Sequence, residues 1–235
     1  MAGGKITQKE IKRDEFARTI GGLTVAVEKN YRSLGIAVGA LLILVVAVIS
    51  GVRYSSSQRK ASILSLAAVQ KAEAAPVTSG AIPGAGVYTT PKQKYEEVVR
   101  LADVVLTQYP SSSAARWATY YKALAQKELG AYQDALTVVE PLTTLQGEEF
   151  LACSARMLKG QIQEAHGDLA AAAETYANLA ASAPERFPVD VVLASQARVL
   201  EAKGDTEGAA QIHRRLMQEF PNSPFAGQNV RPGRS

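Results

Sequence analysis

Twenty consecutive residues without a charge, 33–52, constrain this chain more strongly than any other feature. They read SLGIAVGALLILVVAVISGV and are bounded by Arg32 and Arg53. At 1.5 Å per residue, a helix of this length spans about 30 Å, which is the thickness of the hydrocarbon core of a bilayer. A helix also satisfies its own backbone polar groups there. We therefore expect residues 33–52 to form a transmembrane helix and only the long segment after it to build a core.

Two other interpretations of this run are a buried core helix and a cleaved signal peptide. The apolar part of a signal peptide is usually about 7–15 residues long, and its cleavage site of small residues follows directly. Here 32 residues precede the run, and the nearest A-x-A pattern, at residues 72–74, lies far downstream. We expect the anchor to be retained.

Charge is distributed unevenly along the chain, although the net charge is only +4. Residues 1–72 hold 11 Lys or Arg against four Asp or Glu, whereas residues 91–235 hold 15 against 17. Anionic head groups attract basic residues near a membrane, and a nucleic-acid-binding protein would carry them on its folded domain. We expect no nucleic-acid partner. One cysteine, Cys153, excludes an internal disulfide and a cysteine-based zinc site.

The orientation of the anchor is less strongly encoded, because four Lys or Arg lie within 20 residues of each end of the span. The whole N-terminal tail carries seven, however, and a long domain is translocated largely regardless of its own charge. We therefore expect the N-terminus in the cytoplasm and the C-terminal domain outside it.

Composition divides the chain into six segments. The N-terminal tail is basic and amphipathic in its second half, which suits either a helix on the bilayer surface or a solvated helix. A helix follows the anchor, and then comes a charge-free run rich in Pro, Gly, Ser and Thr that is typical of a linker. The expected segments are a tail (1–32), a transmembrane helix (33–52), a juxtamembrane helix (53–75), a linker (76–91), a repeat domain (92–223) and a C-terminal tail (224–235).

The repeat domain is defined by residues that recur every 37 positions. Gly130, Gly167 and Gly204 set the period. The same spacing relates Ala123, Gly160 and Ala197 before the glycines, and Ala135, Ala172, Ala209, Leu142, Leu179, Leu216, Pro184 and Pro221 after them. Counting back from Pro184 by one and by two periods reaches Gly147 and Pro110. Residues 92–110 are therefore the second half of an earlier repeat.

Each unit of this repeat reads as a helical hairpin. Glycine adopts the left-handed conformation that ends a first helix, and alanine in the second helix lets the first approach closely. Proline then ends the second helix, because it cannot continue one. Since each unit leaves one face uncovered, neighbouring units must stack to bury a continuous core.

The stretch GDLAAAAETYANLAASAP, residues 167–184, is similar to the last part of the tetratricopeptide (TPR) motif. The period here is 37 residues rather than ~34, and Thr119, Arg156 and Leu193 occupy the position of the motif's tryptophan. Together with the charge-free run 33–52, the resemblance implies an all-α protein in which a single N-terminal transmembrane helix precedes a TPR-like α-solenoid of about three and a half helical hairpins.

The layout of the whole chain resembles one group of TPR proteins more closely. The tail ITQKEIKRDEF (6–16), the anchor ending GVRY (51–54), a helix, a linker and the repeats resemble the bacterial inner-membrane proteins grouped with the ancillary subunit of the SecYEG translocon. The resemblance implies a single-pass inner-membrane protein with periplasmic repeats. Its expected partners are translocon components, periplasmic chaperones or emerging client polypeptides. A structural scaffold of another envelope complex, in cell division or outer-membrane assembly, and a cytoplasmic receptor remain as alternatives.

No catalytic motif stands out in the sequence. Phosphate-binding loops, zinc-protease motifs, nucleophile elbows and paired cysteines are all missing from it. His166 and His213 fall inside the repeats, where we expect helix-surface or packing roles, and Cys153 is expected to be a small residue that is buried or half-buried. We expect no enzymatic activity, no cofactor, no metal and no small-molecule substrate.

Recognition of a protein is the remaining function class, and in TPR proteins the first helix of each hairpin lines the binding groove. The repeat register transfers this groove to Trp117, Tyr120, Leu124, Lys127, Glu128, Met157, Gln161, Glu164, Ala194, Arg198 and Glu201. Large aromatic rings such as Trp117 and Tyr120 are enriched among interface hot spots, but they also suit a cap on the core. The charged members suit a solvated face better than a clamp for a peptide carboxylate.

Overall fold

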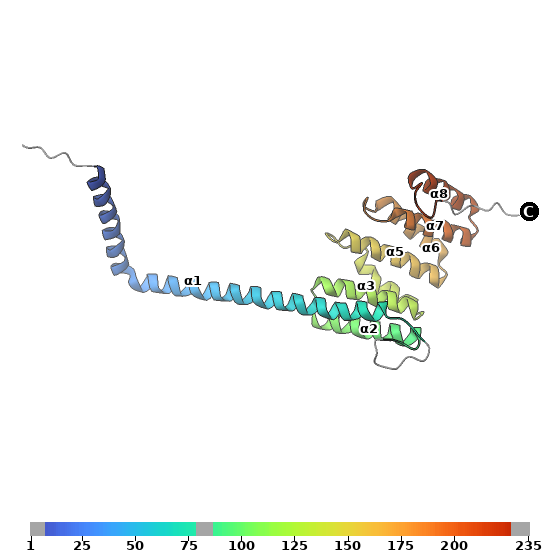
Figure 1. Ribbon diagram of the computed structural model, residues 1–235, viewed down its shortest axis with the longest axis horizontal. Helices are drawn as coiled ribbons and strands as arrows, with labels where there is room; N and C mark the ends of the chain where they lie inside the picture. Colours follow the sequence, from blue (N-terminus) through green and yellow to red (C-terminus); the bar gives the residue numbers. More distant parts are fainter. Residues whose placement is uncertain (1–7, 79–86, 227–235) are drawn as a thin grey trace, which may run out of the picture. The chain divides into compact units, whose positions relative to one another are not determined.

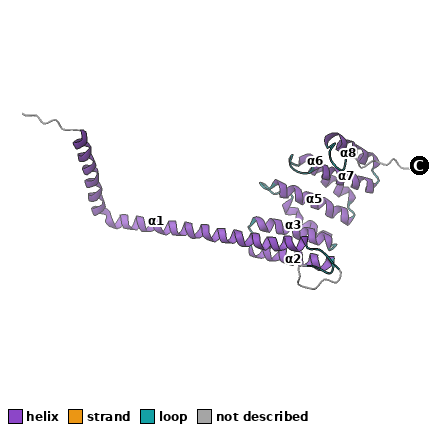
Figure 2. Ribbon diagram, in the orientation of Figure 1, coloured by secondary structure: helices purple, strands orange, loops and turns teal. Residues whose placement is uncertain are grey.

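A computed structural model describes residues 8–78 and 87–226 of the chain (Figure 1). Within these ranges the secondary structure is helical, apart from one isolated β-bridge (Figure 2). The chain forms two compact units, Met1–Ser57 and Gln58–Ser235. The all-α fold predicted from the sequence is confirmed.

The first unit consists of the earlier part of helix α1 (Gln8–Ala74), which contains the predicted transmembrane residues. By length and composition, one helix of the described chain could cross a membrane, and the apolar window in it has no buried residue. The large apolar side chains that the structure describes between Ile36 and Ile49 are 42–73% exposed. The amphipathic pattern expected in the N-terminal tail depends on side chains outside the described residues.

The second unit consists of the end of α1 and a series of shorter helices. They are α2 (Pro91–Gln108), α3 (Ser113–Glu128), α4 (Tyr132–Val139) with the 3₁₀ turn η1 (Glu140–Leu142), α5 (Glu149–His166), α6 (Leu169–Ser182), α7 (Val189–Lys203) and α8 (Thr206–Glu219). The pairs α3–α4, α5–α6 and α7–α8 form the three complete hairpins that the repeat predicts, and successive helices pack against one another (Figure 1).

The period glycines end the first helix of each hairpin, as predicted. Gly130, Gly167 and Gly204 have φ values of 77°, 94° and 87°, in the left-handed region that L side chains rarely adopt. Each glycine N–H donates to the carbonyl three residues back, and the next N–H donates to the carbonyl five residues back, at 2.8–3.0 Å. The three hairpins therefore turn in the same way, which keeps the repeat in register.

Helix starts and stops follow the side chains at their boundaries. Ser112 Oγ accepts from the N–H of Ala115 at 3.0 Å and caps α3, while Pro184 and Pro221 follow the ends of α6 and α8. The second helix of the first complete hairpin, α4, ends before Gly147, which is the position that corresponds to Pro184 in the repeat. It ends at Val139 because Pro141 has no N–H to continue it, and the 3₁₀ turn takes over.

The end of α1, in the predicted juxtamembrane helix (53–75), packs against the helices of the predicted repeat domain (92–223). Val69 is fully buried and Ala72 is 5% exposed, in one core cluster with Val98 of α2 and Ala118 of α3. Gln70 Nε2 also donates to Tyr121 Oη of α3 at 3.4 Å. The expected half hairpin at α2 therefore gains its packing partner from the apolar face of Gln58–Ala74.

Backbone hydrogen bonds join the two described ends of the segment predicted as a linker, 76–91. Val77 and Tyr88 form a parallel bridge, in which Thr78 N–H donates to the Tyr88 carbonyl at 2.9 Å and Tyr88 N–H to the Pro76 carbonyl at 3.2 Å. Pro91 already belongs to α2. Residues 79–86 lie outside the described chain.

The two helices of the α5–α6 hairpin approach each other closely at Gly160. A Cβ built there would lie 2.8 Å from Cζ and 2.9 Å from Cδ1 of Tyr176, and closer still to Cε1. Tyr176 is fully buried. Glycine at this position therefore makes room for the largest fully buried side chain of the repeat unit.

We predict that Val69→Asp destabilises the repeat unit by about 3 kcal/mol or more, because it places a carboxylate in the cluster shared by α1, α2 and α3. Leu64→Asp is the matched control on the same helix, since Leu64 is 72% exposed, and we expect a change within about 0.5 kcal/mol. Urea unfolding of the full chain, followed by the fluorescence of the single tryptophan, measures both. Equal midpoints for the two variants would contradict the role of α1 in the repeat unit.

Candidate partner-binding surface

The residues predicted for the groove form a row across α3, α5 and α7, the first helices of the three hairpins. Positions in this row are related by the 37-residue period, so Tyr120, Met157 and Ala194 correspond. The predicted residues on α3 and α5 are half-buried except Glu128, whereas Arg198 and Glu201 on α7 are exposed. The row is neither sealed in the core nor fully solvated.

The aromatic end of the row lies on α3. Trp117 and Tyr120 meet edge to face, with ring centroids 5.8 Å apart and planes at 72°. Tyr120 meets Tyr121 in the same way at 5.7 Å and 83°. Such edge-to-face pairs are worth about 0.5–1.5 kcal/mol beyond the area they bury. The three rings therefore hold one another in place on a single helix.

Trp117 and Tyr120 differ in how they relate to the core. Tyr120 and Leu124 pack against the core cluster that contains Ala135 and Leu158. Burial is the main cause that raises the pKa of Tyr120 above its ordinary value. Trp117 is half-buried, and its described ring contact is the one with Tyr120. Tyr120 thus caps the core, while Trp117 can present part of its ring to a partner.

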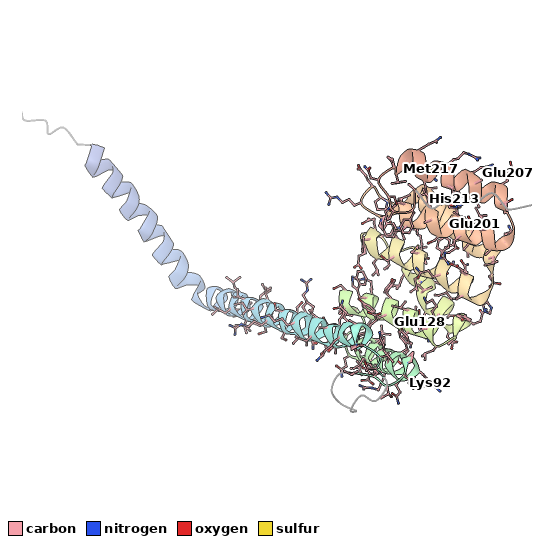
Figure 3. The ribbon with its side chains drawn as sticks, turned by 45° about the vertical axis from the view of Figure 1, so that its right-hand side comes forward. Lys92, Glu128, Glu201, Glu207, His213 and Met217 are labelled. Carbon is pink, nitrogen blue, oxygen red and sulfur yellow. The ribbon has the colours of Figure 1, made fainter. Side chains whose placement is uncertain are left out.

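The charged residues at the end of α3 pair with each other. Lys127 Nζ lies 2.7 Å from Glu128 Oε1, and the two side chains are 19% and 36% exposed. Burial and, after it, the charge of Glu128 raise the pKa of Tyr95 on α2. Figure 3 labels Glu128 near the start of α2 at Lys92. These charges compensate one another within the repeat unit.

Glu164 connects the groove row to the core. Tyr176 Oη on α6 donates to Glu164 Oε2 at 3.4 Å, and Arg198 Nη1 on α7 pairs with Glu164 Oε1. Burial is the largest cause that raises the pKa of Tyr176, and the Glu164 charge adds to it while Arg198 opposes it. One carboxylate therefore joins three helices.

The last hairpin repeats half of this arrangement. His213 occupies the position of Tyr176 one period later, and Glu201 occupies that of Glu164. His213 Nε2 lies 3.0 Å from Glu201 Oε1, and Figure 3 shows the two residues on adjoining helices. From the sequence, His213 is expected to have a helix-surface or packing role, and this partner is not predicted. The 37-residue shift from Glu164 and Tyr176 is the signal that could have found the pair.

A pocket of about 380 Å³ opens beside this pair. Arg198 and Glu201 of the predicted row line it, together with Ala194. The lining residues that sequence reasoning missed are Val191, Ser195, His213, Leu216 and Phe225. Phe225 lies in the segment predicted as a tail, 224–235, yet it is half-buried and packs against the last core cluster.

The residues that could carry chemistry are dispersed. Cys153 is 3% exposed, as predicted, and burial raises the pKa of its thiol while the Arg156 charge opposes the shift. His166 is exposed at the end of α5, where its ring lies 5.5 Å from that of Tyr132. Over the described ranges 8–78 and 87–226, no group of three or more His, Cys, Asp or Glu could hold a metal ion.

A comparison with protein families matches residues 195–223 to the tetratricopeptide repeat. The match covers the second half of α7, all of α8 and the chain up to Ser223. A search among curated proteins found no match for this chain. The fold is thus a TPR-like α-solenoid of helical hairpins, a class that serves protein–protein interaction.

We predict that raising the pH from 9 to 11 destabilises the protein and that Tyr176→Phe reduces this dependence. Because the pKa of Tyr176 is raised on folding, its contribution is fully present below the unfolded pKa near 10 and is lost as the pH rises toward the folded value. Urea unfolding at several pH values should give a slope shallower by about 1 kcal/mol per pH unit in the variant above pH 10.5. Identical slopes would mean that Tyr176 ionises equally in both states.

Proposed function

We propose that this chain is a membrane-anchored adaptor whose helical repeats bind a protein partner. The observation that carries the proposal is the row of half-buried and exposed side chains across α3, α5 and α7. Stacked hairpins present extended surfaces of this kind, and the aromatic end at Trp117 supplies the type of side chain that dominates interface energies. The match to the tetratricopeptide repeat supports the same class of function.

The anchor is proposed to be the charge-free run 33–52. Its support is the exposure of the large apolar side chains from Ile36 to Ile49 in the described helix, because water-exposed surfaces rarely carry such a continuous apolar face. Basic residues precede and follow the run, where lipid head groups would lie. The seven Lys or Arg of the N-terminal tail favour a cytoplasmic N-terminus, which places the repeats outside the cytoplasm.

The proposed partners are components of the Sec translocon, periplasmic chaperones or emerging polypeptides at the bacterial inner membrane. The support for this finer assignment is the resemblance in layout: a short basic tail, a single span, a helix, a linker and the repeats, in that order.

The test begins with topology, using a reporter that is active only outside the cytoplasm and is fused after Ser235. We expect activity, and crosslinking in the same strain should then capture translocon or chaperone components. A silent reporter on a stable fusion would contradict the orientation. Capture of one stoichiometric folded partner from another envelope complex would instead favour a scaffold.

We predict that Trp117→Ala lowers crosslinking to the partner at least about fivefold, the effect of losing roughly 1 kcal/mol at an interface anchor. Met217→Ala is the matched control, because Met217 is 51% exposed on α8 and lies outside the row (Figure 3). Circular dichroism checks that both variants fold. Unchanged capture by a folded Trp117→Ala protein would exclude the aromatic end of α3 from the interface.

A further inference from the structure

The last turns of α1, Gln58–Ala74, have one face inside the repeat unit and one face outside it. Val69 and Ala72 lie on the inward face and pack in one core cluster with side chains of α2 and α3 (Figure 1). Ile63 and Leu64 lie on the outward face and are 61% and 72% exposed. Because the inward face already makes the packing with α2 and α3, these two large side chains are not part of the core.

Basic residues flank the exposed apolar side chains. Residues 53–72 hold four Lys or Arg and no Asp or Glu. Lys60 precedes Leu64 by four residues and Lys71 follows it by seven, which is about one and two turns of helix, so all three lie on one side of α1. The exposed residues of this outward stripe are, in chain order, Lys60, Ile63, Leu64, Ala67, Ala68 and Lys71.

The two lysines of the outward stripe have no carboxylate opposite them. Within residues 8–78 and 87–226, neither Lys60 nor Lys71 makes an ion pair. On the neighbouring helices, by contrast, Lys122 Nζ of α3 lies 2.6 Å from Asp103 Oδ1 of α2. The stripe therefore offers two uncompensated positive charges, eleven residues or about three turns apart, with apolar side chains between them.

Lipid and a second copy of the chain fit this stripe less well than another protein does. α1 is one helix through the charge-free run and the stripe, and twelve residues, about 18 Å of helix, separate Val52 from Leu64. The head-group layer is only about 5–8 Å thick on each side of the hydrocarbon core. A parallel second copy in register would bring Lys60 and Lys71 against their own equivalents, and like charges across an interface are unfavourable.

We propose that the outward stripe of α1 docks a helix of another membrane protein, in which apolar residues lie between two Asp or Glu about three turns apart. The apolar residues of that helix pack over Leu64 and the alanines, whose small side chains allow a close approach. Its carboxylates pair with Lys60 and Lys71. Because both proteins are held in one membrane, the contact does not need a high affinity of its own.

The proposal rests on the proposed membrane anchor for the location of the partner, and it is independent of the row across α3, α5 and α7. The probe for its test is a fluorescent, helix-stabilised peptide with two Glu eleven residues apart and with Leu or Ala on the same face between them. Fluorescence anisotropy measures its binding to the full chain in nanodiscs of phosphatidylcholine. A scrambled peptide of the same composition is the control for the probe.

We expect saturable binding that the double variant Lys60→Glu, Lys71→Glu weakens at least about tenfold, since both attractions become repulsions. A peptide with Lys in place of its two Glu should prefer this variant to the wild type. Such a reversal of preference identifies the charge pairs, because a general loss of structure would weaken both peptides.

Leu64→Asp tests the apolar part of the stripe and should also weaken binding at least about tenfold. Its stability is expected to stay close to that of the wild type, because Leu64 lies outside the core. Arg214 and Met217 provide the matched controls, since both are exposed and lie three residues apart on α8. Arg214→Glu and Met217→Asp should leave binding unchanged.

Three outcomes would overturn the proposal. The first is the absence of saturable binding, or equal binding of the scrambled peptide. The second is loss of peptide binding in nanodiscs that contain phosphatidylglycerol, because the stripe would then lie on anionic lipid. The third is a dimer of the chain in detergent, detected by sedimentation, that Leu64→Asp dissociates. None of these measurements involves the topology reporter or Trp117, so failure here is distinguishable from failure of the proposed function.

Discussion

The close approach of the two helices within each hairpin is the constraint on which the rest of this structure depends. At Gly160 there is no room for even a Cβ beside the ring of Tyr176, and the corresponding positions in the other hairpins hold alanine, Ala123 and Ala197. A larger residue would push the helices apart and with them the seat for the next helix. Because neighbouring repeats contact only each other, an error of this kind would reach the rest of the stack through one interface.

The surface of the stack is connected to its core through repeat-equivalent acidic residues. Glu164 accepts from buried Tyr176, and Glu201 contacts His213 at the same position of the next hairpin. A carboxylate in the candidate binding row therefore also orients a residue of the second helix. Substitutions that are meant to probe partner binding at these positions also alter packing, and the exposed Met217 of α8 gives a cleaner comparison.

Much of the fold could be predicted from the 37-residue period, because glycine at a left-handed helix end and small residues at a close approach each leave a mark in the sequence. The packing of α1 against α2 could not be predicted in this way. The position 37 residues before Trp117 falls inside the segment 76–91, where the repeat register breaks. Pro141 could have predicted the early end of α4, but the 37-residue period indicated an end at Gly147 instead. The pocket depends on how α7, α8 and the turn at Phe225 come together, and a linear pattern carries no information about that.

Because Val77 and Tyr88 are bridged, the length of the loop between them has little effect on how the helices of the repeat unit pack. Two backbone hydrogen bonds hold the ends of this loop together, so α1 and α2 keep their packing whatever lies between them. The entropy of closing a loop rises only with the logarithm of its length, and doubling it costs about 0.6 kcal/mol. Insertions and deletions should therefore accumulate here during evolution, and the loop is a natural place to graft an epitope or a fluorescent domain without disturbing the repeats.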